Sequence, residues 1–168
     1  MGPRDRALTA ALALAWTCAQ AAPVDVRVTD AAGLPLAGAV VFLESAAARE
    51  QVRPLSGIEI GQAERQFQPQ VSIVTRGSAV SFPNRDTVRH HVYSFSDAKR
   101  FEIKLYVGTP AAPVVFDAPG IAVLGCNIHD QMAAWVVIVE TPWYGRSDAD
   151  GRWAGAQQLA VKLAGAGR

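Results

Sequence analysis

The chain has 168 residues, of which half are hydrophobic and only 18% are charged, and its formal net charge is +1 at pH 7. This length fits one medium-sized domain, and the composition is that of a chain that buries a core, which excludes a disordered protein. The near-neutral charge gives no reason to expect nucleic acid or a membrane surface as a partner.

The N-terminus has the pattern of an export signal. Arg4 and Arg6 precede an apolar stretch, and Ala19-Gln20-Ala21 places small residues at the two positions that a signal peptidase reads. The stretch is too short to span a bilayer, and no later stretch is long enough. We therefore expect residues 1–21 to be a cleaved signal peptide and the mature protein to be periplasmic or secreted. The alternatives are a buried N-terminal helix and lipid attachment at Cys18.

Residues 22–66 form the first segment of the mature chain. Val24–Val28 alternates apolar and polar residues, and Ala39–Leu43 is a second apolar run after a turn-rich stretch. This pattern predicts two strands that pair as an opening β hairpin. Ala46–Gln66 is polar and mixed, which predicts a long connection with at most one short strand.

The β pattern is regular between residues 67 and 140. Gly- and Pro-containing turns separate short apolar runs, and no long amphipathic helix interrupts them. The expected strands are Val71–Val74, Ala79–Phe82, Val92–Phe95, Phe101–Tyr106, Val114–Phe116, Ile121–Leu124 and Trp135–Glu140. The sequence therefore predicts an all-β fold of the β-sandwich type. Residues 141–168 have no comparable pattern and are expected to form a short C-terminal tail.

The residues that bind soft or borderline metal ions are few and close together. The histidines are His90, His91 and His129, and the only methionine after the initiator is Met132. Once the leader is removed, Cys126 is the only cysteine. An exported protein with one cysteine forms no internal disulfide, which leaves a free thiol, an intermolecular bridge or a metal ligand. A bare thiol is easily oxidised outside the cell, so a metal ligand is the interpretation that explains why it is kept.

The spacing of these residues indicates one kind of ion. Cys126, His129 and Met132 follow one another at three-residue intervals between two apolar strands, so they converge on a single ion if the loop curls around it. His90 is well placed to add a fourth ligand. Two imidazoles, one thiolate and a weak axial thioether are the ligands of blue copper, whereas zinc gains little from a thioether and an iron–sulfur cluster needs more cysteines. Gln131 or a backbone carbonyl is the alternative axial ligand.

Two stretches of sequence resemble the cupredoxins, the family of plastocyanin, pseudoazurin and amicyanin. The first is Val80–Asp86 followed by His90, and the second is Pro119-Gly120 followed by Cys126-x2-His129-x2-Met132. The resemblance covers residues 67–140 and extends to exported plastocyanin-like proteins that are labelled methylamine utilisation proteins. It implies a Greek-key sandwich with an extra N-terminal hairpin and a short C-terminal tail. It also implies copper ligation by His90, Cys126, His129 and Met132, because the spacing from Asn84 selects His90 over its neighbour.

The sequence departs from the family at two positions. Many cupredoxins have Asn directly after the first copper-binding His, where it ties two ligand loops together, and this chain has His91. Many also have an aromatic residue where this chain has Ile121. Neither departure removes a predicted ligand. His91 is expected to be exposed near the metal or to bond to the ligand loop.

The resemblance implies a function in electron transfer. We expect an exported type 1 copper protein, not an enzyme, that carries one electron at a time between Cu(I) and Cu(II). As a monomer it would exchange electrons with a dehydrogenase or a cytochrome. Two alternatives remain, namely copper delivery or storage and a structural exported domain. Five basic residues lie near the site and form either a docking patch for an acidic redox partner or a solvated face: Arg85, Arg89, Lys99, Arg100 and Lys104.

Overall fold

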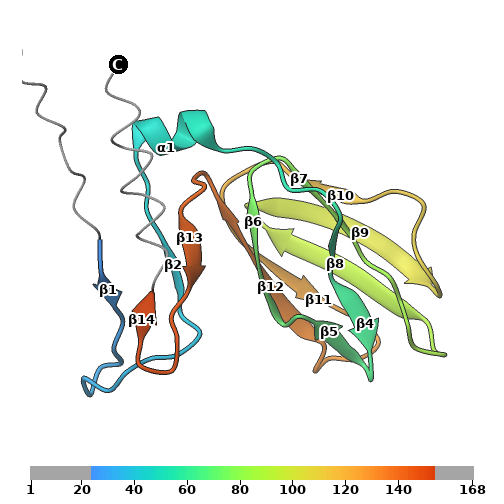
Figure 1. Cartoon of the computed structure of the whole chain (residues 1–168). Helices are drawn as coiled ribbons and strands as arrows, with labels where there is room; N and C mark the ends of the chain where they lie inside the picture. The colour runs from blue at the N-terminus through green and yellow to red at the C-terminus, as the bar shows by residue number, and fades with distance from the viewer. Residues whose placement is uncertain (1–23, 154–168) are drawn as a thin grey trace, which may run out of the picture.

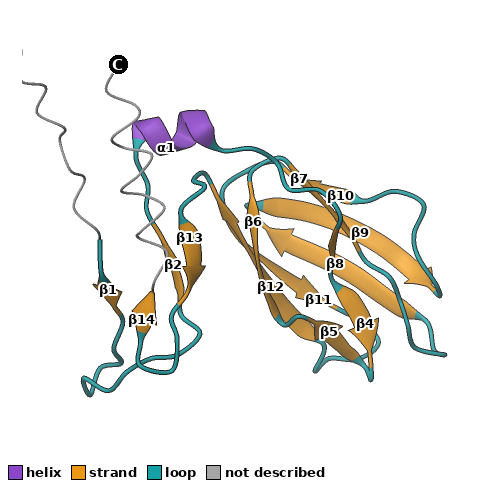
Figure 2. Ribbon diagram, viewed as in Figure 1, coloured by secondary structure: helices purple, strands orange, loops and turns teal. Residues whose placement is uncertain are grey.

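The structure is a computed structural model that describes residues 24–153, so the expected signal peptide lies outside the described residues. Almost all of the regular structure is β strand (Figure 2). None of the helices in the described range is long and apolar enough to cross a membrane. The elements are β1 Val26–Arg27, β2 Val40–Phe42, α1 Ala46–Gln51, β3 Ile58–Glu59, β4 Gly61–Ala63, β5 Gln66–Gln68, β6 Val71–Thr75, β7 Ser78–Ser81, β8 His90–Ser96, β9 Lys99–Tyr106, β10 Val114–Phe116, β11 Gly120–Gly125, β12 Ala133–Val139, β13 Tyr144–Arg146 and β14 Arg152–Trp153.

Two sheets form a sandwich, drawn on the right of Figure 1. One has five strands in the order β6-β12-β11-β8-β9, and the other has three in the order β10-β7-β3. The chain crosses between the sheets after β6, after β7, after β9 and after β10. The prediction of an all-β sandwich is therefore confirmed.

The core of the sandwich follows from alternation along its strands. On β11 and β12 every second residue is buried, because successive side chains of a strand point to opposite faces of a sheet. Val80 and Phe116 come from the three-stranded sheet and pack in one cluster with Leu124 and Val136 of the five-stranded sheet. The same cluster contains Cys126 and Met132, so the loop between β11 and β12, which carries these two predicted ligands, covers one end of the core.

The segment before residue 67 contributes more than the expected connection. β3 pairs in parallel with β7, and β4 and β5 form a hairpin of their own. Ile60 is fully buried in the sandwich core. Residues 46–51 form a short helix that the sequence did not predict, with the Ser45 hydroxyl accepting from the Ala48 amide at 3.0 Å as its N-cap.

A second, smaller lobe stands beside the sandwich. It consists of β1, β2, β13 and β14 with α1 above them, and we call it the small lobe (Figure 1). The hairpin predicted from Val24–Val28 and Ala39–Leu43 is wrong, because within residues 24–153 β1 pairs with β14 and β2 pairs with β13. Local alternation predicted the strands correctly, but it does not specify which strands pair.

The predicted C-terminal tail is also wrong for residues 141–153. These residues supply β13 and β14 and two tryptophans of a separate core, in which Trp143 and Trp153 pack with Ala48. Ser147 ties the lobe together, because its hydroxyl accepts from the Ala39 amide at 3.0 Å and donates to the Leu36 carbonyl at 2.6 Å. The remainder of the predicted tail lies outside the described residues.

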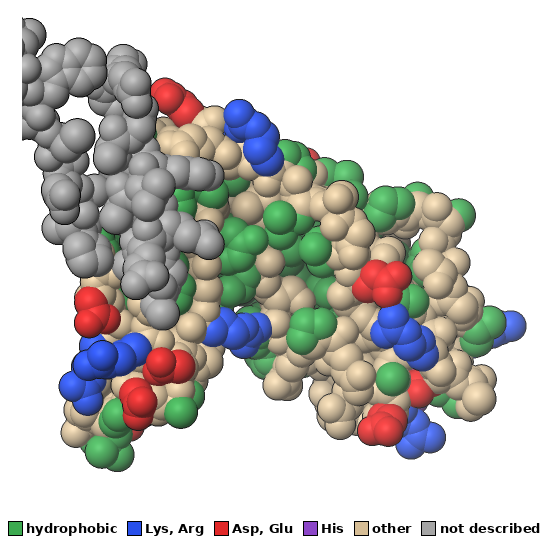
Figure 3. All heavy atoms as spheres, in the orientation of Figure 1, with side chains coloured by type: hydrophobic (Ala, Val, Ile, Leu, Met, Phe, Trp, Pro, Cys, Tyr) green, Lys and Arg blue, Asp and Glu red, His purple; other side chains and the backbone are tan. Residues whose placement is uncertain are grey.

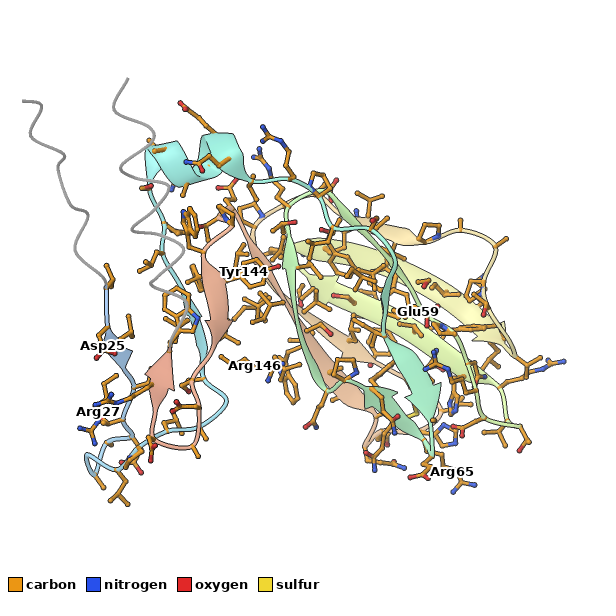
Figure 4. All side chains as sticks on the ribbon, in the orientation of Figure 1. Asp25, Arg27, Glu59, Arg65, Tyr144 and Arg146 are labelled. Atoms are coloured by element: carbon orange, nitrogen blue, oxygen red, sulfur yellow. The ribbon has the colours of Figure 1, made fainter. Side chains whose placement is uncertain are left out.

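Few polar contacts join the two lobes. Arg146 of β13 lies between them and donates to the Val71 carbonyl at the start of β6 (Figure 4). Near the other end of the same junction, Arg49 of α1 and Arg76 both pair with Glu140, at 3.5 and 2.6 Å. On the face of the molecule drawn in Figure 3, hydrophobic side chains gather between the two lobes. The small lobe therefore lies against the β6 edge of the sandwich, which leaves the β8 and β9 side free of it.

Candidate metal centre

β8 begins at the two adjacent histidines and sends them to opposite faces of the sheet. His90, Val92 and Ser94 point into the sandwich and are fully buried. His91 lies on the other face with Tyr93 and Phe95, and its ring is 5.5 Å from that of Tyr93. A bulge between His90 and Val92 interrupts the pairing with β9. Such bulges re-aim side chains next to functional sites.

The parity of β11 and β12 places Cys126 and Met132 inside. Ala122 and Leu124 are buried on β11, and Cys126 is the next inward position, 3% exposed. Met132 is 1% exposed and precedes the inward positions Ala134 and Val136 of β12. Both residues line the same surface pocket. The loop between the two strands therefore begins and ends with a buried sulfur.

Three of the four predicted ligands present their donor atoms to one another. The ligand atoms of His90, Cys126 and His129 all lie within 4.8 Å of each other. The Cys126 Sγ atom is 3.9 Å from Nδ1 of His129, and the rings of His90 and His129 meet edge to face with centroids 5.0 Å apart. The loop turns back on itself because the Met132 amide donates to the His129 carbonyl at 2.9 Å. His129 is the partly exposed member of the three.

The donor set fits a soft, redox-active ion. Nδ1 of His90 and Nδ1 of His91 are both buried without a hydrogen-bond partner among residues 24–153, and of the two histidines only His90 belongs to the cluster. Donors at about 2.0 Å (nitrogen) and about 2.3 Å (sulfur) from one ion lie at most about 4.3 Å apart, so the observed cluster needs little contraction. Thiolate and imidazole are donors that copper prefers. His90, Cys126 and His129 are thus the residues that would hold copper, which would supply one-electron redox chemistry.

His91 takes no part in this cluster. Its Nε2 atom lies 2.8 Å from Oε1 of Glu102, which is the residue paired with Tyr93 on β9. The side chain is 6% exposed and faces away from Cys126, as the alternation of β8 requires. The expectation that His91 is exposed is wrong, because its side chain packs on the sheet and is buried. Its bond is to β9, so the expected contact with the ligand loop is also absent among the described residues.

The loop from β7 to β8 is fixed by two polar side chains. Asn84 donates to the carbonyls of Val88 and Tyr106, at 2.8 and 2.9 Å. Its Oδ1 accepts from the Asp86 amide at 3.0 Å, and the Asp86 carboxylate reaches His90 Nε2 at 2.7 Å. Burial raises the pKa of Asp86, but hydrogen bonds from Arg65, His90 and Glu64 outweigh burial and hold this pKa below its ordinary value. The sequence showed Asp86 four residues before His90 but not that the two side chains meet.

A partly buried polar side chain, Tyr106, lies next to the cluster. The Tyr106 hydroxyl donates to the Phe82 carbonyl at 2.6 Å and accepts from Nε2 of Gln62. Burial raises the pKa of Tyr106 from 10.0 to about 12, and Cys126 lies near enough to add to this shift. Tyr106 is opposite His90 in the β8–β9 pairing. The Tyr106 side chain is therefore neutral and hydrogen-bonded at physiological pH, and it lies beside the candidate centre.

The basic residues near the centre are largely paired with carboxylates. Arg85 bonds to Glu59 at 2.8 Å, Lys99 to Asp117 at 2.8 Å and Arg100 to Asp97 at 2.9 Å. Exposed pairs of this kind contribute little to stability, but they cancel local charge. The net positive charge near the centre is thus smaller than the sequence indicated.

No protein-family model matches the chain, and no curated protein matches it in sequence. Solved structures do match, and copper proteins are among them. The chain is similar to a reduced Cu(I) form of an amicyanin variant, with 19% identity, a TM-score of 0.45 and coverage of 60% of this chain and 98% of amicyanin. It is similar to a purple cupredoxin from Nitrosopumilus maritimus, with 19% identity, a TM-score of 0.41 and coverage of 48% and 96%. A copper-containing nitrite reductase from Thermus scotoductus SA-01 matches at 21% identity and a TM-score of 0.46 over 52% of this chain, but over only 23% of the reductase.

Proposed function

We propose that this protein is an exported type 1 copper protein that carries single electrons between redox partners. The observation that carries the proposal is the meeting of His90, Cys126 and His129, whose ligand atoms lie within 4.8 Å of one another at the end of a β-sandwich. Met132 is the fourth ligand, in the weak axial position. The partners are redox proteins such as a dehydrogenase or a cytochrome, and the protein itself catalyses no reaction.

Each residue has a part in this function. Cys126 and His90 are buried, which limits the access of water to the strong ligand positions. The sandwich holds them from separate strands, so the geometry changes little when the charge of the ion changes. His129 is partly exposed, and its ring edge is the shortest path from the centre to a docked partner.

The direct test of the electron-carrier function is reversible redox cycling. The copper-loaded full-length protein is reduced and re-oxidised in a spectroelectrochemical cell, with the metal content measured before and after. We expect one reversible one-electron couple and full retention of copper. Irreversible reduction, or loss of the ion in the Cu(I) state, would contradict electron transfer.

One observation favours copper delivery as a second candidate. A pocket of about 510 Å³ opens at the surface beside the centre, and Cys126, Met132 and Asp130 are among the residues that line it. An acceptor that reaches these sulfurs would be able to take the ion by ligand exchange. Transfer of Cu(I) to a thiol-rich acceptor peptide within minutes would favour delivery, whereas retention would favour the electron carrier.

A further inference from the structure

The Asp86 carboxylate contacts the buried histidine of the candidate centre. Its Oδ2 atom lies 2.7 Å from Nε2 of His90, a side chain with no solvent exposure. Asp86 lies in the irregular segment before β8, and His90 is the first residue of that strand, so no regular backbone structure accounts for the contact. Because Nε2 faces a carboxylate, only Nδ1 is free for other chemistry.

Two backbone amides from a second part of the chain donate hydrogen bonds to the Asp86 carboxylate. The Glu64 amide donates to Oδ1 at 2.7 Å, and the Arg65 amide donates to Oδ2 at 3.0 Å. Both residues form the turn between β4 and β5 and have φ of 54° and 55°, a left-handed conformation that non-glycine residues rarely adopt. Arg65 marks this turn at the far end of the hairpin in Figure 4. The turn aims two N–H groups at one side chain.

We propose that Asp86 is a positioning residue for the metal centre. As a carboxylate it accepts the Nε2 proton of His90, which fixes the tautomer whose Nδ1 lone pair is available to an ion. Its negative charge also makes the imidazole a stronger donor and favours the oxidised ion. The turn of Glu64 and Arg65 keeps the carboxylate in place. This inference rests on the proposed copper site.

The neighbouring histidine provides a matched comparison. His91 Nε2 bonds to Glu102 at 2.8 Å, so the same pair of groups recurs one residue along the strand. Glu102 is half exposed, and its histidine lies on the outer face of the sheet, away from Cys126. If these carboxylates only stabilised the fold through their histidines, replacing Asp86 and replacing Glu102 would have equal effects on copper affinity and reduction potential. If Asp86 positions a metal ligand, only its replacement changes these two quantities.

The test compares Asp86→Asn, Asp86→Ala and Glu102→Gln in the full-length protein. Asn has nearly the size of Asp and keeps one acceptor oxygen, so Asp86→Asn guards against a variant that fails to fold. The reduction potential of the copper-loaded protein and its copper affinity, by chelator competition, are measured for each. Nitrogen NMR of the copper-free protein reports the tautomer of His90 independently of the metal.

We expect Asp86→Asn to raise the reduction potential and Asp86→Ala to lower copper affinity by about 10- to 100-fold, with Glu102→Gln matching the wild type. In the copper-free wild type His90 carries its proton on Nε2, and Asp86→Ala loses this preference. An unchanged potential in Asp86→Asn, an equal shift in Glu102→Gln, or an unchanged tautomer in Asp86→Ala would overturn the proposal. If the wild type binds no copper, the proposed function fails, and the tautomer measurement still decides whether Asp86 fixes His90.

Discussion

Cys126 Sγ lies 3.9 Å from Nδ1 of His129, within the loop that joins β11 to β12. The same loop carries Met132, and the buried ring of His90 reaches it from β8. Since β8 and β11 are neighbours in the sheet, the fold itself brings the histidine to the loop. The centre thus depends on two strand ends and one short loop.

Replacement of His90 and replacement of His91 should affect copper affinity differently. His90→Ala removes a buried donor from the cluster, and we expect copper affinity to fall by more than about 100-fold, beyond the loss caused by removing an outer hydrogen-bond partner. His91→Ala removes only the bond to Glu102, so affinity should stay near that of the wild type. Chelator competition measures both. Equal losses in the two variants would contradict the assignment of His90.

Met132→Leu tests the axial ligand. Leu has a volume similar to that of Met, so at this buried position the free energy of unfolding should change by less than about 1.5 kcal/mol. Copper should remain bound by the three strong ligands. The reduction potential should rise, because the oxidised ion loses a donor. A potential equal to that of the wild type would show that Gln131 or a carbonyl oxygen supplies the axial position.

Local patterns predicted the strands and the candidate ligands, because these depend on alternation and on residue spacing. Ala122, Leu124 and Cys126 are inward positions of one strand, and the sequence alone shows that parity. The pairing of β1 with β14 joins residues from opposite ends of the described chain, and alternation carries no information about such partners. Likewise the role of Asp86 depends on the turn at Glu64, which is distant in sequence. Three-dimensional contacts between loops were thus outside the reach of pattern reasoning.

Tyr106→Phe tests the polar side chain that lies beside the centre. The variant loses the hydroxyl that bonds to Phe82 and Gln62, and we expect the free energy of unfolding to fall by about 1 kcal/mol at neutral pH. The pKa of Tyr106 is raised from 10.0 to about 12, so folding favours the protonated phenol. This contribution is complete below pH 10 and is lost as pH rises to about 12.

The difference in stability between the wild type and Tyr106→Phe should therefore narrow over that pH range. Urea unfolding at a series of pH values measures it. The other tyrosines titrate in both proteins and cancel in the difference. A difference that stays constant through alkaline pH would contradict the raised pKa.

Gly145→Ala tests whether the small lobe is independent of the centre. A Cβ at this position would clash with the indole of Trp153, so the variant is overpacked there and its free energy of unfolding should fall by about 1–3 kcal/mol. Tryptophan fluorescence reports the change through Trp143 and Trp153. Copper binding should be unaffected, because the two hydrophobic cores are separate. A parallel loss of copper would show that the two lobes fold as one unit.

The most direct test of the copper site is the visible and electron paramagnetic resonance spectrum of the copper-loaded full-length protein, recorded beside Cys126→Ser. Cys126 is buried, so replacing it removes the thiolate without altering an exposed surface. We predict one copper ion per chain and an intense thiolate-to-Cu(II) charge-transfer band in the wild type, and no such band in Cys126→Ser. Copper loading without this band, or identical spectra of the two proteins, would contradict the account.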